Sequence, residues 1–179
     1  MQSGHADSPP SPWIARFGRR VDRAQTVLDL ACGTGRHARF FAARGHTVLA
    51  VDRDPQLDAA PGLEVLTADL ESGPLLDTLM RRKFGCVVVA NYLHRPLLPW
   101  IAGAVEAGGW LLYETFAEGN ERYGHPRNPN FLLKPGELLG AARGELTVVA
   151  YEHGLVGEGS SRAVIQRIAA QRTEDVPLL

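Results

Sequence analysis

Five short stretches of the chain are apolar along their whole length, and polar or glycine-rich sequence follows each one. Uninterrupted apolar runs are typical of strands that are buried on both faces of a sheet. Because helix-like segments separate several of them, the pattern predicts a parallel sheet with right-handed crossovers and helices on both faces. The predicted strands span residues 26–30, 46–52, 63–69, 84–91 and 109–116, and the predicted helices span residues 36–43, 75–82 and 96–106.

The last part of the chain has a different pattern. Two strand-like runs, at 146–154 and 161–171, are joined by the short stretch LVGEGS without a helix. This arrangement predicts an antiparallel hairpin at the sheet edge. The fold expected is therefore α/β, with a Rossmann-like seven-stranded sheet that is mostly parallel and ends in an antiparallel hairpin. Prolines at 55 and 61 limit any helix within residues 53–62 to one or two turns.

The length and composition narrow the class of protein. A chain of 179 residues with 45% hydrophobic residues suits one globular domain, expected over residues 11–172, with a flexible arm at 1–10 and a tail at 173–179. The net charge of −1 provides no positive field for nucleic acid or an anionic membrane. We find no secretion signal or membrane-spanning run, so we expect a cytoplasmic protein. The two cysteines lack metal-type spacing, and we predict no metal site.

A glycine-rich turn follows the first predicted strand. Gly33 and Gly35 lie in this turn, and Asp52 closes the next predicted strand. Such a turn and acid serve nicotinamide dinucleotides and S-adenosylmethionine alike. Asp29, just before the turn, discriminates between them, because a carboxylate repels a pyrophosphate and attracts an ammonium or a sulfonium. The turn therefore favours S-adenosylmethionine.

The stretch DLACGTG at 29–35 resembles the first motif of the class I S-adenosylmethionine-dependent methyltransferases. NYLHRPLL at 91–98, together with residues 113–139, is similar to small bacterial methyltransferases of the tellurite-resistance type. The resemblance implies S-adenosyl-L-methionine as cofactor and a seven-stranded sheet that ends in a hairpin.

The same resemblance implies roles for single residues. Asp52 would hold the ribose hydroxyls, and Arg53 would lie beside the adenine. Asp69 and Leu70 would bound the adenine edge, and Asn91 would close the fourth strand near the methyl group. The predicted cofactor-binding residues are Asp29, Ala31, Gly33, Gly35, Asp52, Arg53, Asp69, Leu70 and Asn91.

Methyl transfer from a sulfonium requires mainly in-line placement of the nucleophile and at most one base. The candidate catalytic residues are His94, Glu114 and Tyr92. Residues 116–133 carry few helix or strand signals, and long connections of this kind are often lids. We expect a substrate lid here, docked by the cluster at 131–133. The candidate substrate-binding residues are Arg95, Asn120, Tyr123, His125 and Phe131.

The function predicted is methyl transfer to a small molecule under the lid loop, without nucleic acid or membrane as partner. Two alternatives stay open. An RNA or protein methyltransferase would need added basic surface or a partner. A protein that binds S-adenosylmethionine or a dinucleotide without catalysis would need only the glycine turn. The sequence leaves the methyl acceptor and the oligomeric state open.

Overall fold

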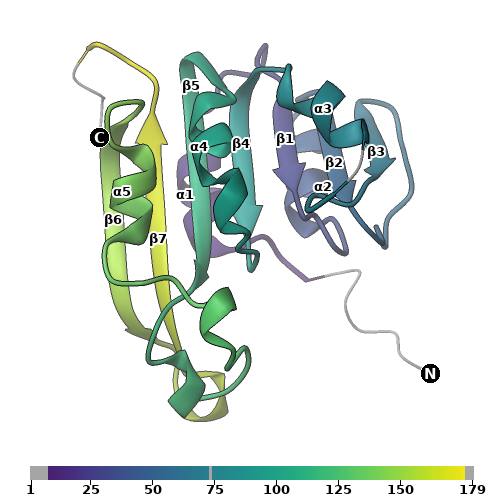
Figure 1. Cartoon of the computed structure of the whole chain (residues 1–179). Helices are drawn as coiled ribbons and strands as arrows, with labels where there is room; N and C mark the ends of the chain where they lie inside the picture. The colour runs from purple at the N-terminus through teal and green to yellow at the C-terminus, as the bar shows by residue number, and fades with distance from the viewer. Residues whose placement is uncertain (1–7, 73, 176–179) are drawn as a thin grey trace.

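A computed structural model describes residues 8–72 and 74–175 of the chain. These residues form a seven-stranded sheet with helices on both of its faces (Figure 1). The strands are β1 (Val27–Leu30), β2 (Val48–Asp52), β3 (Leu63–Thr67), β4 (Phe84–Ala90), β5 (Val105–Phe116), β6 (Thr147–Val156) and β7 (Ala163–Gln171). The helices are α1 (Pro12–Gly18), α2 (Arg36–Ala42), α3 (Pro74–Met80), α4 (Leu98–Gly103) and α5 (Glu137–Ala142).

The strand order is β3-β2-β1-β4-β5-β7-β6. Strands β1 to β5 pair in parallel, whereas β7 is antiparallel to both β5 and β6. The predicted mostly parallel sheet with a terminal antiparallel hairpin is thus confirmed. The order reverses between β1 and β4, and ligands of open α/β sheets bind beyond the carboxyl ends of the strands at such a switch point. None of the described helices has both the length and the apolarity to cross a bilayer.

Successive strand residues face opposite sides of the sheet and build two apolar cores. On one side, Leu28 and Val87 belong to the core that α3, α4 and α5 cover. On the other side, Val27 and Val88 belong to the core that α1 and α2 cover. Figure 1 shows the two layers of helices in front of and behind the sheet. Because both faces are covered, only the strand ends and loops remain to build a site.

Helix α1 is an element that the sequence reasoning missed. The Ser11 side chain accepts hydrogen bonds from the backbone N–H groups of Trp13 and Ile14, and Pro12 occupies the first turn. A serine cap followed by proline is a helix-start signal. Trp13, Ile14 and Phe17 are buried, so the start of the chain's described part covers the sheet. Residues 1–7 of the predicted arm and 176–179 of the predicted tail lie outside the described residues.

The connection between β4 and β5 differs from the prediction. β5 begins at Val105, and the predicted helix at 96–106 is replaced by a 3-10 turn, Arg95–Leu97, followed by α4, which ends at Gly103. The β4–β5 pairing shifts register between Phe84 and Cys86, so residues 106–109 bulge from the ladder. Gly108 and Gly109 tolerate that irregular backbone. Because glycine is not a strand signal, the same two residues led the sequence to predict a later start for the strand.

The segment between β2 and β3 holds no helix, which is within the predicted limit of one or two turns. Residues 53–62 fold back on the glycine turn. The Gln56 backbone N–H donates to the Gly33 carbonyl at 2.9 Å, and the Leu57 side chain lies against Gly35. The short segment therefore supports the turn after β1.

Candidate active site

The turn between β1 and α2 has a left-handed backbone at three positions. The φ angles are 57° at Ala31, 52° at Gly33 and 73° at Gly35. Glycine adopts this region without strain. A Cβ atom at Gly35 would also lie 2.2 Å from the Leu57 Cδ1 atom, so both conformation and space require glycine there. The carboxylate of Asp52, at the end of β2, accepts a hydrogen bond from the Gly33 N–H at 2.8 Å and ties the turn to β2.

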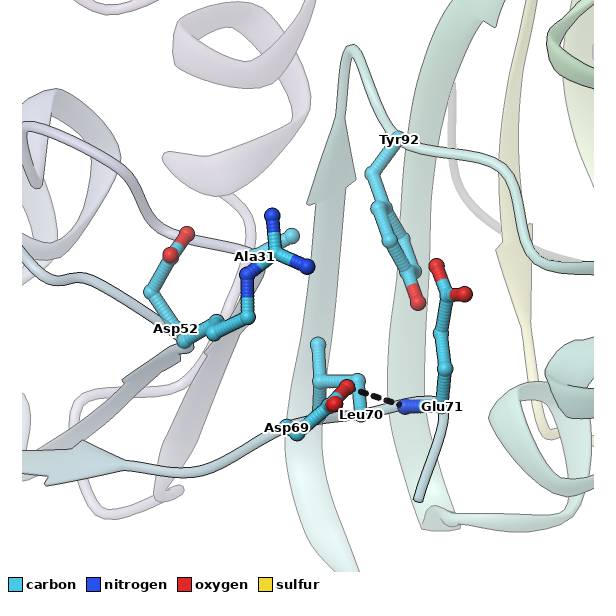
Figure 2. A pocket seen from close by; sticks show the side chains of 7 residues that line it. Ala31, Asp52, Asp69, Leu70, Glu71 and Tyr92 are labelled. Carbon is cyan, nitrogen blue, oxygen red and sulfur yellow. Dashed lines mark hydrogen bonds between the residues drawn. The ribbon is translucent and has the colours of Figure 1, made fainter.

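One cavity, the first cavity, opens at the carboxyl ends of β1, β2 and β4 (Figure 2). It contains three carboxylates and one guanidinium. Its lining residues are Ala31, Asp52, Arg53, Asp69, Leu70, Glu71 and Tyr92. Five of these are predicted cofactor-binding residues, Tyr92 is a predicted catalytic residue, and Glu71 was missed although it follows Asp69 by two positions.

A second cavity shares Ala31 with the first and lies beside the glycine turn. Its lining residues are Ala31, Cys32, Gly33, Thr34, Arg36, His37, Ala90 and Asn91. Asn91 has a φ of 55°, which is rare for a residue other than glycine. Such conformations gather at functional sites, and here Ala31 and Asn91 follow the neighbouring strands β1 and β4. The cavity thus brings together three predicted cofactor-binding residues.

Tyr92 presents an unpaired group to the first cavity. Its hydroxyl oxygen is buried and has no hydrogen-bond partner among the described residues. Figure 2 shows the ring upright at the cavity wall, with the hydroxyl on the side of Glu71. Burial raises the pKa of Tyr92, so the hydroxyl keeps its proton at neutral pH. Because a buried orphan hydroxyl is costly, this group is available to donate to a ligand.

Asp69 is held as an ionised carboxylate at the opposite wall. The Glu71 N–H donates to its Oδ1 atom at 2.9 Å, shown dashed in Figure 2, and the Ser72 hydroxyl donates to Oδ2 at 3.0 Å. These hydrogen bonds lower the pKa of Asp69. The first cavity is therefore acidic in charge as well as in composition.

Asp29 does not line either cavity. Its side chain is 1% exposed, and its Oδ2 atom accepts a hydrogen bond from the Ala38 N–H at 2.9 Å. Burial raises the pKa of this carboxyl to about 7. Asp29 thus holds α2 against β1 below the glycine turn. The expected attraction of a cationic ligand by Asp29, directly or through water, stays a prediction, and the burial of its side chain does not favour direct contact.

Two further groups of the second cavity are uncharged. His37 is buried, its Nε2 atom accepts a hydrogen bond from the Ser11 N–H at 3.2 Å, and burial lowers its pKa to about 3. Cys32 is also buried, and burial raises its thiol pKa to about 12. Neither group therefore carries charge at neutral pH, and His37 serves to fix the start of α1 over α2.

The other two catalytic candidates lie outside both cavity walls. The Nδ1 atom of His94 is 3.8 Å from Glu71 Oε2, so His94 is linked to the first cavity through Glu71. Glu114, in β5, is 9% exposed and stands in register with Ala90 of β4. Of the three candidates, the structure brings only Tyr92 to a cavity.

Asn120 has a structural role in the described loop, and its expected contact with substrate stays a prediction. It is 1% exposed, its Oδ1 atom accepts from the Val164 N–H at 3.1 Å, and its Nδ2 atom donates to the Pro126 carbonyl at 3.2 Å. Both ends of its amide are thus used inside the protein.

The cluster at 131–133 divides in a way the sequence did not predict. Leu132 and Leu133 are 2% and 0% exposed, and Leu133 bridges to Ala117 at the base of the loop. Phe131 is 50% exposed and does not dock the loop. The base of the loop therefore belongs to the core, while Phe131 faces outward.

Arg95 lines neither cavity and is bonded to the loop and to α5, and its expected contact with substrate stays a prediction. Its Nε and Nη2 atoms donate to the two carboxylate oxygens of Glu137 at 2.7 and 3.0 Å. It also donates to the carbonyls of Leu132 at 2.7 Å and Asn130 at 3.0 Å. We name this set of contacts the Arg95 clasp. Tyr123 and His125 are exposed on the loop and line neither cavity.

Comparison with known proteins follows the same division of the chain. Residues 28–99 match a family model described as a methyltransferase domain. This range contains every residue that lines the two cavities. The trans-aconitate 2-methyltransferase of Mycobacterium tuberculosis (strain ATCC 25177 / H37Ra) is 37% identical over 121 residues, which cover 61% of this chain and 43% of that protein. The chain thus spans less than half the length of the curated relatives it matches.

Solved structures share the fold over nearly the whole chain. TehB from Haemophilus influenzae superposes with a TM-score of 0.67 at 15% identity, covering 96% of this chain and 63% of that chain. The 1,6-didemethyltoxoflavin-N1-methyltransferase of Burkholderia thailandensis, solved with S-adenosylhomocysteine, has a TM-score of 0.65 at 18% identity, covering 91% and 77%. A TehB-like methyltransferase from Corynebacterium glutamicum has a TM-score of 0.61 at 22% identity, covering 88% and 86%.

Proposed function

We propose that this chain is a class I S-adenosylmethionine-dependent methyltransferase, which its fold and its matched domain support, and that it transfers a methyl group from S-adenosyl-L-methionine to a small molecule. The acidic first cavity at the switch point of the sheet, next to the left-handed glycine turn, carries the proposal. A dinucleotide would bring its pyrophosphate beside Asp52, Asp69 and Glu71, which repel it. The bound S-adenosylhomocysteine of a structural neighbour supports the same cofactor.

The described residues fit this cofactor. The two carboxylate oxygens of Asp52 accept from the Gly33 N–H at 2.8 Å and the Asp54 N–H at 2.9 Å, and each has a further lone pair that can accept from a ribose hydroxyl. Arg53 would lie beside the adenine, and Leu70 would bound its edge. The Tyr92 hydroxyl, which has no hydrogen-bond partner within the described part of the chain, would donate to the nucleoside. The cofactor supplies the reactive methyl group and a good leaving group.

Catalysis then depends on placement and on one proton acceptor where the substrate requires it. Tyr92 keeps its proton and suits donation. Glu114 and His94 are therefore the candidate bases, because both follow or lie at strand ends beside the cavities. We infer that residues 116–133 form a lid that excludes water and contacts the acceptor through its exposed side chains, Tyr123, His125 and Phe131.

The acceptor class follows from charge and from the relatives. A net charge of −1 does not favour a polyanionic substrate. Relatives and neighbours are named for small acceptors, trans-aconitate and 1,6-didemethyltoxoflavin. We propose a small-molecule acceptor, a cytoplasmic location and no requirement for nucleic acid or membrane.

Calorimetry of the purified chain tests the cofactor. We expect S-adenosylmethionine and S-adenosylhomocysteine to bind with micromolar affinity and NAD to give no heat. Binding of NAD without either adenosyl compound would overturn the proposal. Transfer of a tritiated methyl group into a cell extract tests the acceptor. Label in the small-molecule fraction supports it, whereas label in RNA or protein selects the alternative methyltransferase class.

A further inference from the structure

We infer that the small-molecule methyl acceptor is an amine, and that Glu114, near the carboxyl end of β5, binds its nitrogen and accepts its proton. This inference rests on the proposed function and deepens it, because it names the chemical class of the substrate. It also selects Glu114 over His94 as the base.

Glu114 is a buried acid whose carboxylate has no partner in the described part of the chain. The residue is 9% exposed, and its carboxylate forms no hydrogen bond or ion pair with a described residue. Asp29, Asp52 and Asp69, the acids at or just after the ends of β1, β2 and β3, each accept at least one backbone N–H. Because a buried carboxylate without a partner is costly, we expect a ligand to supply the partner of Glu114.

The carboxylate oxygens of Glu114 stay within reach of a ligand. The side-chain atoms of the described residues that are both fully buried and unpaired are Arg44 Nε, His46 Nε2 and the Tyr92 hydroxyl oxygen. The oxygens of Glu114 are unpaired too, but they are not in this set, so they keep some contact with solvent. The side chain is therefore buried along its stem and open at its charged end.

Strand pairing places Glu114 beside the second cavity. It is in register with Ala90 of β4, which lines that cavity, and its carbonyl accepts the Asn91 N–H at 3.0 Å. Residues in register on neighbouring strands face the same side of a sheet and lie about 5 Å apart. The methyl group of the cofactor is expected near Asn91, so the Glu114 carboxylate lies next to the place where an acceptor must bind.

The cation beside Glu114 is already engaged. Arg167 of β7 is in register with Glu114 on its other side. Its Nε and Nη2 atoms both donate to Glu152 Oε2, the first at 2.8 Å, and its guanidinium lies 4.8 Å from the centroid of the Trp13 ring. Glu114 therefore presents a negative charge that attracts an ammonium and repels an anionic acceptor.

The two helices that cover this face contribute cations and one neutral imidazole. α1 packs against β5 and carries Arg16, which is exposed. α2 packs against β1 and β2 and carries Arg36, Arg39 and His37, and burial lowers the pKa of His37 to about 3. Neither helix contains an acid, so neither competes with Glu114 for a cationic group.

The transfer step balances with Glu114 as the proton acceptor. The carboxylate takes one proton from the ammonium form of the acceptor and frees the lone pair of the nitrogen. That pair forms the bond to the methyl carbon, while the carbon–sulfur bond breaks and leaves its electrons on sulfur. The positive charge moves from sulfur to nitrogen, and Glu114 releases its proton to solvent, so the product ammonium again faces a carboxylate.

Chemical blocking of the acceptor tests its class. A small-molecule cell extract is acetylated and then treated with mild base, which restores hydroxyl and thiol groups and leaves amines blocked. The wild-type chain and S-adenosylmethionine with a tritiated methyl group are added to treated and untreated extract. We expect the treatment to abolish transfer of label. Label that persists, or that base releases from an ester as methanol, would overturn the inference and leave the proposed function standing.

Variants of Glu114 test the residue in untreated extract. Glu114→Gln should slow transfer by about a hundredfold or more at pH 7, and Glu114→Asp, which keeps the charge on a shorter stem, should lose less. Glu114→Gln depends on amine that is already neutral in solution, so its deficit should shrink by about tenfold for each unit of pH below the pKa of the amine. Glu106→Gln, at the other end of β5, should match the wild type. Equal rates for Glu114→Gln and the wild type, or a deficit that is constant with pH, would overturn the inference.

Calorimetry with S-adenosylhomocysteine separates the possible failures. Both Glu114 variants should bind it as the wild type does, which shows that they fold and keep the cofactor site. If Glu114→Gln does not bind it, Glu114→Asp carries the comparison of rates. A wild-type chain that binds neither S-adenosylmethionine nor S-adenosylhomocysteine refutes the proposed function before any acceptor is tested.

Discussion

The two halves of the site use their sequence-predicted residues differently. In the half built from β1, β2 and β4, most of the predicted residues line a cavity. In the half around the loop at 116–133, the side chains of Asn120, after β5, and Arg95, after β4, form hydrogen bonds that hold the loop in place. The carboxyl ends of parallel strands lie at the same edge of a sheet, whatever side chains they carry. The orientation of a loop side chain depends instead on the residues that it contacts. Position along a strand is therefore the more informative signal for a ligand contact.

The base of the loop should be as important for stability as the sheet itself. Leu133 is 0% exposed within the core, so Leu133→Ala should lower the free energy of unfolding by about 2–5 kcal/mol. Phe131→Ala is the matched control, because Phe131 is 50% exposed and its truncation should change stability by less than about 0.5 kcal/mol. Urea unfolding followed by circular dichroism measures both. Equal effects would remove the distinction between a buried base and an outward side chain.

The Arg95 clasp predicts a smaller loss. Glu137→Gln keeps the size of the side chain but replaces a charge-assisted bidentate pair, and the free energy of unfolding should fall by about 1–2 kcal/mol. Residues 116–133 should also be cleaved faster by a protease of low specificity. Glu152→Gln, which disrupts the exposed pair with Arg167 outside the loop, should leave this cleavage unchanged. If cleavage is equally slow in Glu137→Gln, the clasp does not hold the loop.

These contacts show why the sequence predicted the sheet better than the loop. Apolar runs located all seven strands, because the hydrophobic pattern of a strand is visible in its own few residues. The pairs that organise the loop are distant in sequence: Asn120 and Val164 are 44 residues apart, and Arg95 and Glu137 are 42 apart. Local pattern cannot report such partners. The same limit applies to Asp29, which the sequence predicted to attract a ligand. Its position in β1 does not reveal that the Ala38 N–H donates a hydrogen bond to its carboxylate.

Within the cavity half, Asp52 should matter most for binding. Its carboxylate both lines the first cavity and ties down the Gly33 N–H. Asp52→Asn should weaken S-adenosylhomocysteine about tenfold, or about 1.4 kcal/mol, in calorimetry. Asp54→Asn removes a carboxylate two residues away that lines neither cavity, and its affinity should equal that of the wild type. Matching losses in the two variants would indicate a general charge effect, and the ribose contact would then be wrong.

Asp29 differs from Asp52 because it is buried and lines neither cavity. Burial raises the pKa of its carboxyl from the ordinary value of 3.8 to about 7, so between these pH values the native state retains a proton that the unfolded chain has released. Stability from this group is complete below about pH 4 and falls as the pH rises towards 7, by at most about 1.4 kcal/mol per pH unit. Asp29→Asn cannot titrate, so its stability relative to the wild type should rise over this window, as urea unfolding at a series of pH values would show. A constant difference across the window would mean that Asp29 is ionised in the folded protein, and its carboxylate would then be available to attract a cationic ligand after all.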